Sequence, residues 1–233
     1  MTTNNSVDSP LAGTTGTGNF VGSNTPTVTT PKIITSILDT NGNIIENLAP
    51  IASAVNYIQV QNNATGANPV IFGTGSDTNV ALQLNGKGTG GATVQGTSTN
   101  DNATAGYVGE FVSNIIAAAS AVAAPNVTAT NVTSISLTAG DWDVWGNVST
   151  SSVPTATTAF AGWISSTSAT LPDQSLYADI TLATGTIAAG IGMSVPQRRF
   201  TLSATTTVFL SGEFSGTSGS GSICGGIYAR RVR

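Results

Sequence analysis

Charged side chains are scarce in this chain, and this scarcity limits the folds that are open to it. Only 8% of the 233 residues are Asp, Glu, Lys or Arg. A surface α-helix draws on such residues, together with Gln, for its exposed face. Thr, Ser, Asn, Gly and Val are abundant instead; Thr and Val favour strands, while Gly, Asn and Ser favour turns. We therefore expect an all-β protein whose surface consists of hydroxyl and amide groups.

The composition also excludes several classes of function. The chain has no histidine and one cysteine, Cys224. Histidine is the commonest general base at neutral pH and a common metal ligand, so Ser-His-Asp catalysis, Cys-His catalysis and most zinc sites are excluded. The net charge of −4 argues against nucleic acid as the main partner, because phosphate binding requires clustered Lys and Arg. We expect no enzymatic activity, no cofactor and no metal.

Neither disorder throughout the chain nor membrane insertion is expected. Hydrophobic residues make up 39% of the sequence and the net charge is small, which is unlike a wholly disordered chain. The first residues lack the basic and apolar regions of a leader peptide. The longest apolar stretch, residues 115–124, is too short to span a bilayer.

Residues 1–45 are predicted to form an extended arm with one hairpin. Residues 1 to about 36 are low in complexity and would form either a flexible tail or a peptide that orders on a partner surface. We favour the second, because their few apolar residues stand in a polar background. Asn41-Gly42 lies between two β-branched runs, which is the strongest short hairpin signal. The predicted anchoring residues of the arm are Phe20, Val21, Pro26, Val28, Pro31 and Ile33.

Residues 46–105 are predicted to form a short shaft followed by a polar linker at 96–105. Short alternating runs are separated by Gly-rich corners, and each run offers only one thin apolar face. A single copy of this segment has too little core to be stable, so we expect three chains to share the core in a trimeric β-prism. The predicted strands are 57–60, 70–72, 80–84 and 92–94.

Residues 106–233 are predicted to form a globular β-sandwich or jelly roll. All three tryptophans fall here, where their large apolar area favours a packed core. Alternating runs separated by turn signals are typical of such folds. For residues 113–124 we favour strand and loop over helix, because Pro125 and β-branched residues flank them. The predicted strands are 132–137, 142–148, 160–165, 177–182, 199–202, 208–210 and 223–231.

Several segments of the sequence resemble segments of bacteriophage virion proteins. Two segments of the N-terminal half that carry this resemblance are Gly-Thr-Gly-Asn-Phe-Val-Gly-Ser-Asn-Thr-Pro-Thr (16–27) and Gly-Ser-Asp-Thr-Asn-Val-Ala-Leu-Gln-Leu (75–84), with further matches at 30–33 and 86–90. They look like the proximal part of phage tail fibres. The phrases at 107–110, 137–144 and 228–233 look like a terminal domain of phage and prophage proteins. The resemblance implies a particle-bound arm, a shaft and a head.

The strand pattern of residues 106–233 also resembles the trimeric jelly roll of the tumour necrosis factor and complement-type superfamily. In that family a strand with the pattern "Gly, one residue, Trp or Tyr" and a late "hydrophobic, Gly, hydrophobic" strand pack at the trimer axis. The two resemblances together imply a homotrimeric short tail fibre or spike of the virion, made in the host bacterial cytoplasm. Its arm would bind a tail, neck or capsid protein, and its head would contribute to host attachment. The alternative is a capsid head fibre or decoration protein without a receptor role.

Two groups of charged residues are candidates for binding sites. Asp141 and Asp143 lie two apart on a predicted strand and share a face, which suits a solvated strand start better than paired catalytic carboxylates. A Ca²⁺ site that uses Asp141, Asp143 or Asp173 is a further interpretation, since it needs only clustered oxygens. Four late arginines would either be solvated or trimer-interface charges paired with Asp179 or Glu213, or contact an anionic host glycan or other surface receptor. These arginines are Arg198, Arg199, Arg230 and Arg231.

Overall fold

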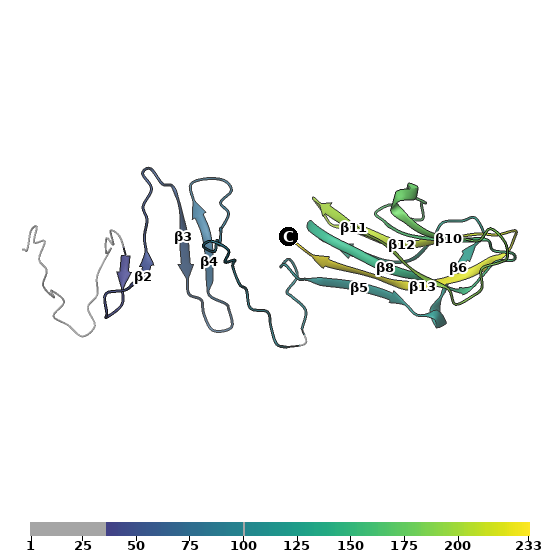
Figure 1. Ribbon diagram of the computed structural model, residues 1–233, viewed down its shortest axis with the longest axis horizontal. Coiled ribbons are helices and arrows are strands. Elements are labelled where there is room, and N and C mark those ends of the chain that lie inside the picture. Colours follow the sequence, from purple (N-terminus) through teal and green to yellow (C-terminus); the bar gives the residue numbers. More distant parts are fainter. Residues whose placement is uncertain (1–35, 100) are drawn as a thin grey trace, which may run out of the picture. The chain divides into compact units, whose positions relative to one another are not determined.

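A computed structural model describes residues 36–99 and 101–233, which form an all-β protein without α-helices in that part of the chain (Figure 1). The chain divides into two compact units between Val94 and Gln95. We call the described residues 36–94 the first unit and residues 95–233 the head unit, and each is described by itself. The predicted anchoring residues Phe20 to Ile33 lie outside the described residues.

The predicted hairpin around Asn41-Gly42 is confirmed. Strands β1 (Ser36–Leu38) and β2 (Ile44–Asn47) pair antiparallel, and the loop between them contains both residues. Gly42 has a φ of +84°, which glycine adopts without strain. The Asp39 carboxylate accepts hydrogen bonds from the backbone N–H groups of Asn41 and Asn43, both at 2.8 Å. An Asp side chain that bonds the following backbone therefore shapes this turn.

Two of the four predicted shaft strands are confirmed and two are wrong. Strands β3 (Asn56–Gln61) and β4 (Val70–Gly75) form a second antiparallel hairpin. Residues 80–84 and 92–94 are not in strands. Their alternating pattern indicates which side chains would share a face, but a strand also requires a neighbouring backbone to pair with, and β3–β4 remains a two-stranded sheet.

The head unit consists of two antiparallel sheets that enclose one core, which is a β-sandwich. One sheet has the strand order β10-β9-β12-β7 and the other has the order β11-β8-β13-β5, with β6 also paired to β13. The strands are β5 (Phe111–Ile116), β6 (Val122–Pro125), β7 (Thr130–Leu137), β8 (Gly140–Ser152), β9 (Ala159–Ser165), β10 (Tyr177–Thr181), β11 (Gly192–Leu202), β12 (Thr206–Ser215) and β13 (Ser220–Arg231).

Every predicted strand of this region falls on an observed one, and several observed strands are longer than predicted. The prediction of strand and loop for residues 113–124 is confirmed: β5 and β6 are joined by the short 3₁₀ turn η1 (Ala118–Ser120). A second 3₁₀ turn, η2 (Gln174–Leu176), lies between β9 and β10.

The strand pairs of the head unit are nested along the chain. The first long strand, β5, pairs with the last, β13. Moving inward from both ends, β7 pairs with β12, β8 with β11 and β9 with β10. The chain thus runs as one long antiparallel hairpin that is wrapped over the two sheets.

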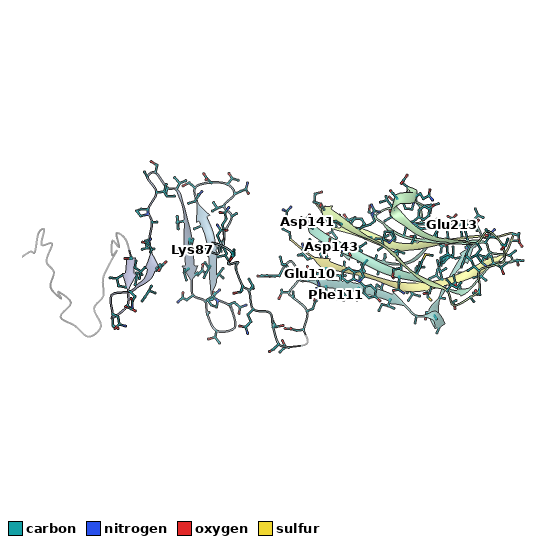
Figure 2. The ribbon with its side chains drawn as sticks, in the orientation of Figure 1. Lys87, Glu110, Phe111, Asp141, Asp143 and Glu213 are labelled. Carbon is teal, nitrogen blue, oxygen red and sulfur yellow. The ribbon has the colours of Figure 1, made fainter. Side chains whose placement is uncertain are left out.

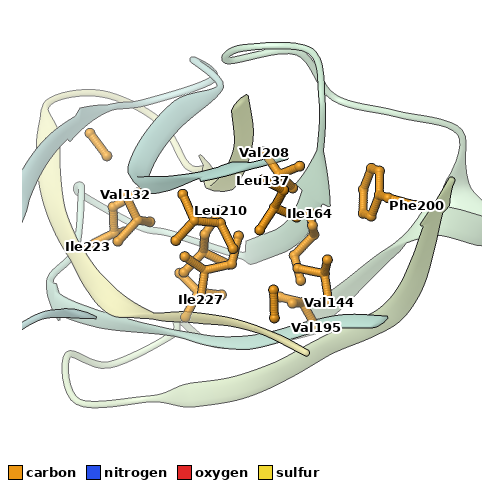
Figure 3. Packing of buried hydrophobic residues seen from close by; sticks show 14 of the residues in the cluster. Val132, Leu137, Val144, Ile164, Val195, Phe200, Val208, Leu210, Ile223 and Ile227 are labelled. Atoms are coloured by element: carbon orange, nitrogen blue, oxygen red, sulfur yellow. The ribbon is translucent and has the colours of Figure 1, made fainter. Parts of the chain in front are cut away.

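The core lies between the two sheets and is made of alternate residues from each strand (Figure 3). Phe160 and Phe214 stack within it with their ring centroids 5.0 Å apart. The side chains of Trp142, Ile164 and Leu210 are fully buried. This core supplies the apolar burial that stabilises a domain of this size.

The sandwich has two distinguishable ends. At the end that we call the entry end, the N–H of Gly109 donates to the carbonyl of Arg231, and the N–H of Asp141 donates to that of Arg233, both at 3.0 Å. At the far end, the connections 153–158, 183–191 and 216–219 bond to one another, for example from the N–H of Thr155 to the carbonyl of Ser218. Strand β8 runs from the entry end to the far end.

Candidate functional site

The outer face of the β11-β8-β13-β5 sheet carries the most distinctive surface of the head unit. Along β8, Trp142, Val144 and Val148 belong to the core, so Asp143, Trp145 and Asn147 point outward. The same alternation places Tyr228 of β13 on the outer face. We call this surface the outer aromatic face.

Three rings from three adjacent strands meet on this face. The centroid of Trp145 lies 6.0 Å from those of Phe111 and Tyr228, and the rings of Phe111 and Tyr228 are 6.3 Å apart. All three side chains are half-buried. Residues 101–103 adjoin Phe111 and Arg230 at one edge of the face. Such aromatic patches carry large apolar area and are enriched at protein interfaces.

The apolar surface continues from the rings along β13 and β5. Tyr228 leans over Gly226, because a Cβ at Gly226 would lie 2.6 Å from the tyrosine oxygen. Gly226 pairs with Ile115, which is 59% exposed. Beyond it lies Cys224, which is buried and unpaired with any cysteine. The strip formed by Cys224, Gly226 and Ile115 carries no charge, so removing it from water in a contact would be favourable.

A hollow of about 490 Å³ opens beside Trp145. It forms where the register of β11 and β8 shifts between Val195 and Arg198. A bulge of this kind bends the strand and opens the ladder. Asp143 and Arg230 line the hollow together with Trp145, so an aromatic ridge and a partly polar hollow lie side by side.

Charged residues gather at the entry end of the same face. Asp143 of β8 lies opposite Arg199 of β11 and Arg230 of β13 in the sheet. The buried carboxylate of Asp141 binds the guanidinium groups of Arg199 at 3.1 Å and Arg233 at 3.0 Å. Hydrogen bonds from Thr201 and Arg199, with the charge of Arg233, hold the pKa of Asp141 below its ordinary value. Figure 2 shows Asp141, Asp143 and Glu110 together at this end.

Within one chain, the structure shows no pairing of the described arginines with Asp179 or Glu213, and pairing across a trimer interface stays a prediction. Arg199 pairs with Asp141, and Arg231 pairs with Glu110 at 2.9 Å. Arg198 donates to the carbonyl of Ile164 at 2.7 Å and lies over the Phe200 ring. The sequence could not choose these partners, because each is set by which strands become neighbours.

The four arginines also do not form one glycan-binding cluster. Arg231 is 4% exposed and its guanidinium lies 4.4 Å from the centre of the Trp142 ring. A buried side chain of this kind cannot reach a host surface, so the prediction is wrong for Arg231. Arg230 is exposed on the outer aromatic face.

The prediction that Asp141 and Asp143 share a strand face holds, but the predicted solvation of Asp141 is wrong. Asp141 is 4% exposed and is held by two guanidinium groups. Asp173 lies in the β9–β10 connection, where its carboxylate accepts the N–H of Ser175. Asp173 thus lies on a different element from Asp141 and Asp143. The described residues contain no group of three or more His, Cys, Asp or Glu side chains placed to hold a metal.

Trp145 was not singled out from the sequence, whereas Trp142 carries the "Gly, one residue, Trp" pattern. The structure places Trp142 in the core, where its indole N–H donates to the carbonyl of Thr138 at 2.9 Å. Since the two tryptophans are three residues apart on one strand, they point to opposite sheet faces. That spacing was the available signal that one tryptophan faces outward.

Comparison with protein-family models finds no match to this chain, and comparison with curated proteins finds none either. In the part of the chain that the structure describes, no helix has the length and apolar character needed to cross a bilayer.

Proposed function

We propose that this protein is a non-enzymatic structural component of a bacteriophage particle, a homotrimeric short fibre or spike. In this proposal the arm binds the particle, residues 46–105 form a shaft whose core is shared by three chains, and the head unit contributes to host attachment. The chain would be made in the bacterial cytoplasm and reside in the virion.

The observation that carries the proposal is the lack of a core in the first unit. None of residues 36–94 is buried. Its apolar side chains lie largely in water; Val60 is 75% exposed, Ile58 63% and Ile45 68%. Two isolated hairpins of this kind are not stable alone in water, and large exposed apolar surfaces mark association sites. Copies of the same chain are the partner that is always present at the right stoichiometry.

The outer aromatic face supports self-association of the head unit as well. In a ring of three identical chains, each contact joins two different patches, so a ridge on one copy must fit a hollow on the next. The Phe111–Trp145–Tyr228 ridge and the hollow beside Trp145 are such a pair of unlike patches. Asp143 and Arg230 in the hollow offer hydrogen-bond partners to the Tyr228 hydroxyl of a neighbour.

The nested strand pairing supports the jelly-roll form of the head. Pairing of β5 with β13, β7 with β12, β8 with β11 and β9 with β10 is the pattern expected when one long hairpin wraps into an eight-stranded double sheet. This order is compatible with the resemblance to the tumour necrosis factor and complement-type trimers. A fold alone assigns no function. The support for assembly comes from the exposed apolar side chains of the first unit and from the outer aromatic face.

The solution mass of the full-length protein, measured by light scattering after gel filtration, tests the assembly. We expect the mass of three chains. A mass of one chain at micromolar concentration would contradict both the shared shaft core and the head contact.

A matched pair of variants tests the head contact specifically. Ile115→Asp places a charge on the outer aromatic face at a site that is 59% exposed, and Val127→Asp places one on the β6–β7 connection at a site that is 65% exposed. We expect Ile115→Asp to weaken assembly of the head unit by roughly tenfold or more, because an unpaired carboxylate would be desolvated. Val127→Asp should assemble as the parent protein does; equal behaviour of the two variants would place the contact elsewhere.

A further inference from the structure

A second surface feature lies on the opposite sheet of the head unit. Ala159 and Ala161 of β9 point outward and form the floor of a groove of about 180 Å³. Ala161 is flanked in the sheet by Asp179 of β10 and Glu213 of β12. Because alanine is short, the longer side chains of the two neighbouring strands form the walls of the groove.

One end of the groove is closed by apolar groups. Tyr177 of β10 lines it, and Leu171, which is 43% exposed, enters from the β9–β10 connection. Asn131 ties that connection to the sheet, since it accepts the N–H of Ala169 at 2.8 Å and donates to the Ser168 hydroxyl at 2.7 Å. The apolar end is therefore held in place by hydrogen bonds.

The two carboxylates of the groove differ in the hydrogen bonds that they accept from the protein. Asp179 accepts a hydrogen bond from the Thr181 hydroxyl at 2.9 Å. Glu213 is half-buried, and among residues 36–99 and 101–233 no group donates a hydrogen bond to it or forms an ion pair with it. No basic residue lines the groove. A partly desolvated carboxylate without a protein donor relies on water or a ligand for its hydrogen bonds.

The groove remains open in the proposed assembly. It lies on the β10-β9-β12-β7 sheet, whereas the outer aromatic face belongs to the other sheet. Figure 2 shows Glu213 well away from the entry end where Asp141 and Glu110 lie. A trimer that packs through the outer aromatic face would point this groove outward, toward the surroundings of the particle.

We propose that the groove lined by Leu171, Tyr177, Asp179 and Glu213 is a carbohydrate-binding site for neutral or amino sugars. A sugar ring has an apolar face that packs on Tyr177 and Leu171, and an edge of hydroxyl groups that donate to carboxylates. Ionised carboxylates accept several hydrogen bonds, which are stronger than those between neutral groups. The groove combines such acceptors with the apolar groups of Leu171 and Tyr177, and small-ligand sites likewise combine apolar surface with placed polar groups.

The charge of the groove sets the class of sugar. Two carboxylates without a basic side chain beside them repel phosphate and carboxylate groups of a ligand. They favour ligands that donate hydrogen bonds from hydroxyl or ammonium groups. The site thus differs from an arginine-based contact with an anionic glycan. The inference rests on the proposed role in host attachment, because a sugar on the outside of the particle would be a host-surface sugar.

Ligand binding to the full-length protein tests the inference. Saturation-transfer NMR would be recorded with D-glucose, D-galactose, N-acetyl-D-glucosamine, D-glucosamine and D-glucose 6-phosphate. We expect at least one of the four sugars without phosphate to bind with a Kd on the order of 1 mM, and glucose 6-phosphate to bind at least roughly tenfold more weakly.

Two variants assign the binding to the groove. Glu213→Gln keeps the shape but loses the charge, and Ala161→Leu fills the floor with a side chain that points away from the core. Each should weaken sugar binding by roughly tenfold, and Glu213→Gln should also reduce the discrimination against glucose 6-phosphate. Glu46→Gln, the same change at an exposed site on β2 outside the head unit, is the matched control and should bind sugar as the parent does. Circular dichroism would establish that each variant is folded.

The outcomes separate the groove from the assembly. Absence of binding to all four sugars, unchanged binding in both groove variants, or equal binding of glucose 6-phosphate would overturn the site, even if the protein is a trimer. A single-chain mass with intact, groove-dependent sugar binding would instead overturn the proposed fibre and leave the site standing.

Discussion

A buried guanidinium organises the entry end of the head unit. The Nε of Arg231 lies 2.9 Å from Glu110, its Nη1 donates to the carbonyl of Ala139 at 2.8 Å, and its Nη2 donates to the Thr138 hydroxyl. Glu110 also accepts the N–H of Gly106 at 2.8 Å. One ion pair thus joins the segment that enters the unit, the β7–β8 connection and the last strand.

We expect Glu110→Ala to destabilise the head unit by about 3 kcal/mol, because removing one partner of a buried ion pair leaves the other charge uncompensated. Urea unfolding followed by tryptophan fluorescence would measure the change. Arg199→Ala is the control: Arg199 is 58% exposed in its pair with Asp141, so solvent already screens much of that interaction and the effect should be far smaller. Equal effects of the two changes would contradict this role of Glu110.

The ionised carboxylate of Glu213 should destabilise the head unit, whereas that of Glu110 stabilises it. Burial raises the pKa of its carboxyl group, so the folded state holds the proton more tightly than the unfolded state. Its effect on stability is therefore absent below the unfolded pKa and becomes destabilising as the pH rises through the raised folded pKa. We expect Glu213→Gln to increase the free energy of unfolding at neutral pH.

Urea unfolding at two pH values would test this expectation. At a pH of about 3 both forms are neutral, so Glu213→Gln and the parent should be equally stable. If the variant is less stable than the parent at neutral pH, the ionised carboxylate has a stabilising partner. If stability rises as expected, the parent retains a residue that lowers its stability, which is common at binding sites.

At the scale of the elements, glycines on β13 fix how closely the strands approach. Gly225 has a φ of +152°, and a Cβ there would lie 2.1 Å from the carbonyl oxygen of Asn147 on β8. An alanine at this position would push the central pair of the sheet apart or strain the backbone. The strand that carries both Tyr228 and Arg231 therefore depends on this glycine for its register.

We expect Gly225→Ala to lower the free energy of unfolding of the head unit by roughly 2 kcal/mol or more, as overpacking of a core does. Chemical denaturation would measure it. Gly96→Ala is the matched control, since a Cβ at Gly96 meets nothing within 4 Å. A loss below about 0.5 kcal/mol for Gly225→Ala would show that the sheet relaxes around the added methyl group.

The elements also show why some strands were predictable and others were not. Alternation located β7, β9 and β12, because their inward residues meet a core within the same chain. The same alternation at residues 80–84 and 92–94 was misleading, since no strand of the described chain pairs with them. An alternating pattern shows which side chains would lie on one face of a strand. It does not show that a second strand is available to pair with the segment.

For the whole molecule, the distribution of buried residues predicts that the two units differ in autonomy. The core of the described residues lies in the head unit and extends from Ala124 to Ala229 along the chain. The first unit has no buried residue among those described. The head unit should therefore fold from its own sequence, whereas the first unit should need copies of itself.

We expect the fragment 95–233 to unfold cooperatively on heating, with one transition in circular dichroism and in tryptophan fluorescence. The fragment 1–94 should lack such a transition at low concentration and gain structure as its concentration rises, because association supplies its core. A cooperative, concentration-independent transition in the fragment 1–94 would show that it has a core of its own.

The sequence by itself determined the all-β class, the hairpin at Asn41-Gly42 and the strand positions of the head unit, because few charges, β-branched alternation and turn residues act locally. Only the tertiary structure decided that Arg231 is buried with Glu110, that Trp145 rather than Trp142 faces outward, and that Asp179 and Glu213 flank Ala161. Each of these depends on which strands lie next to one another and in which register. Pairing between residues far apart in sequence is set by the packing of the whole sandwich, and no local pattern encodes it.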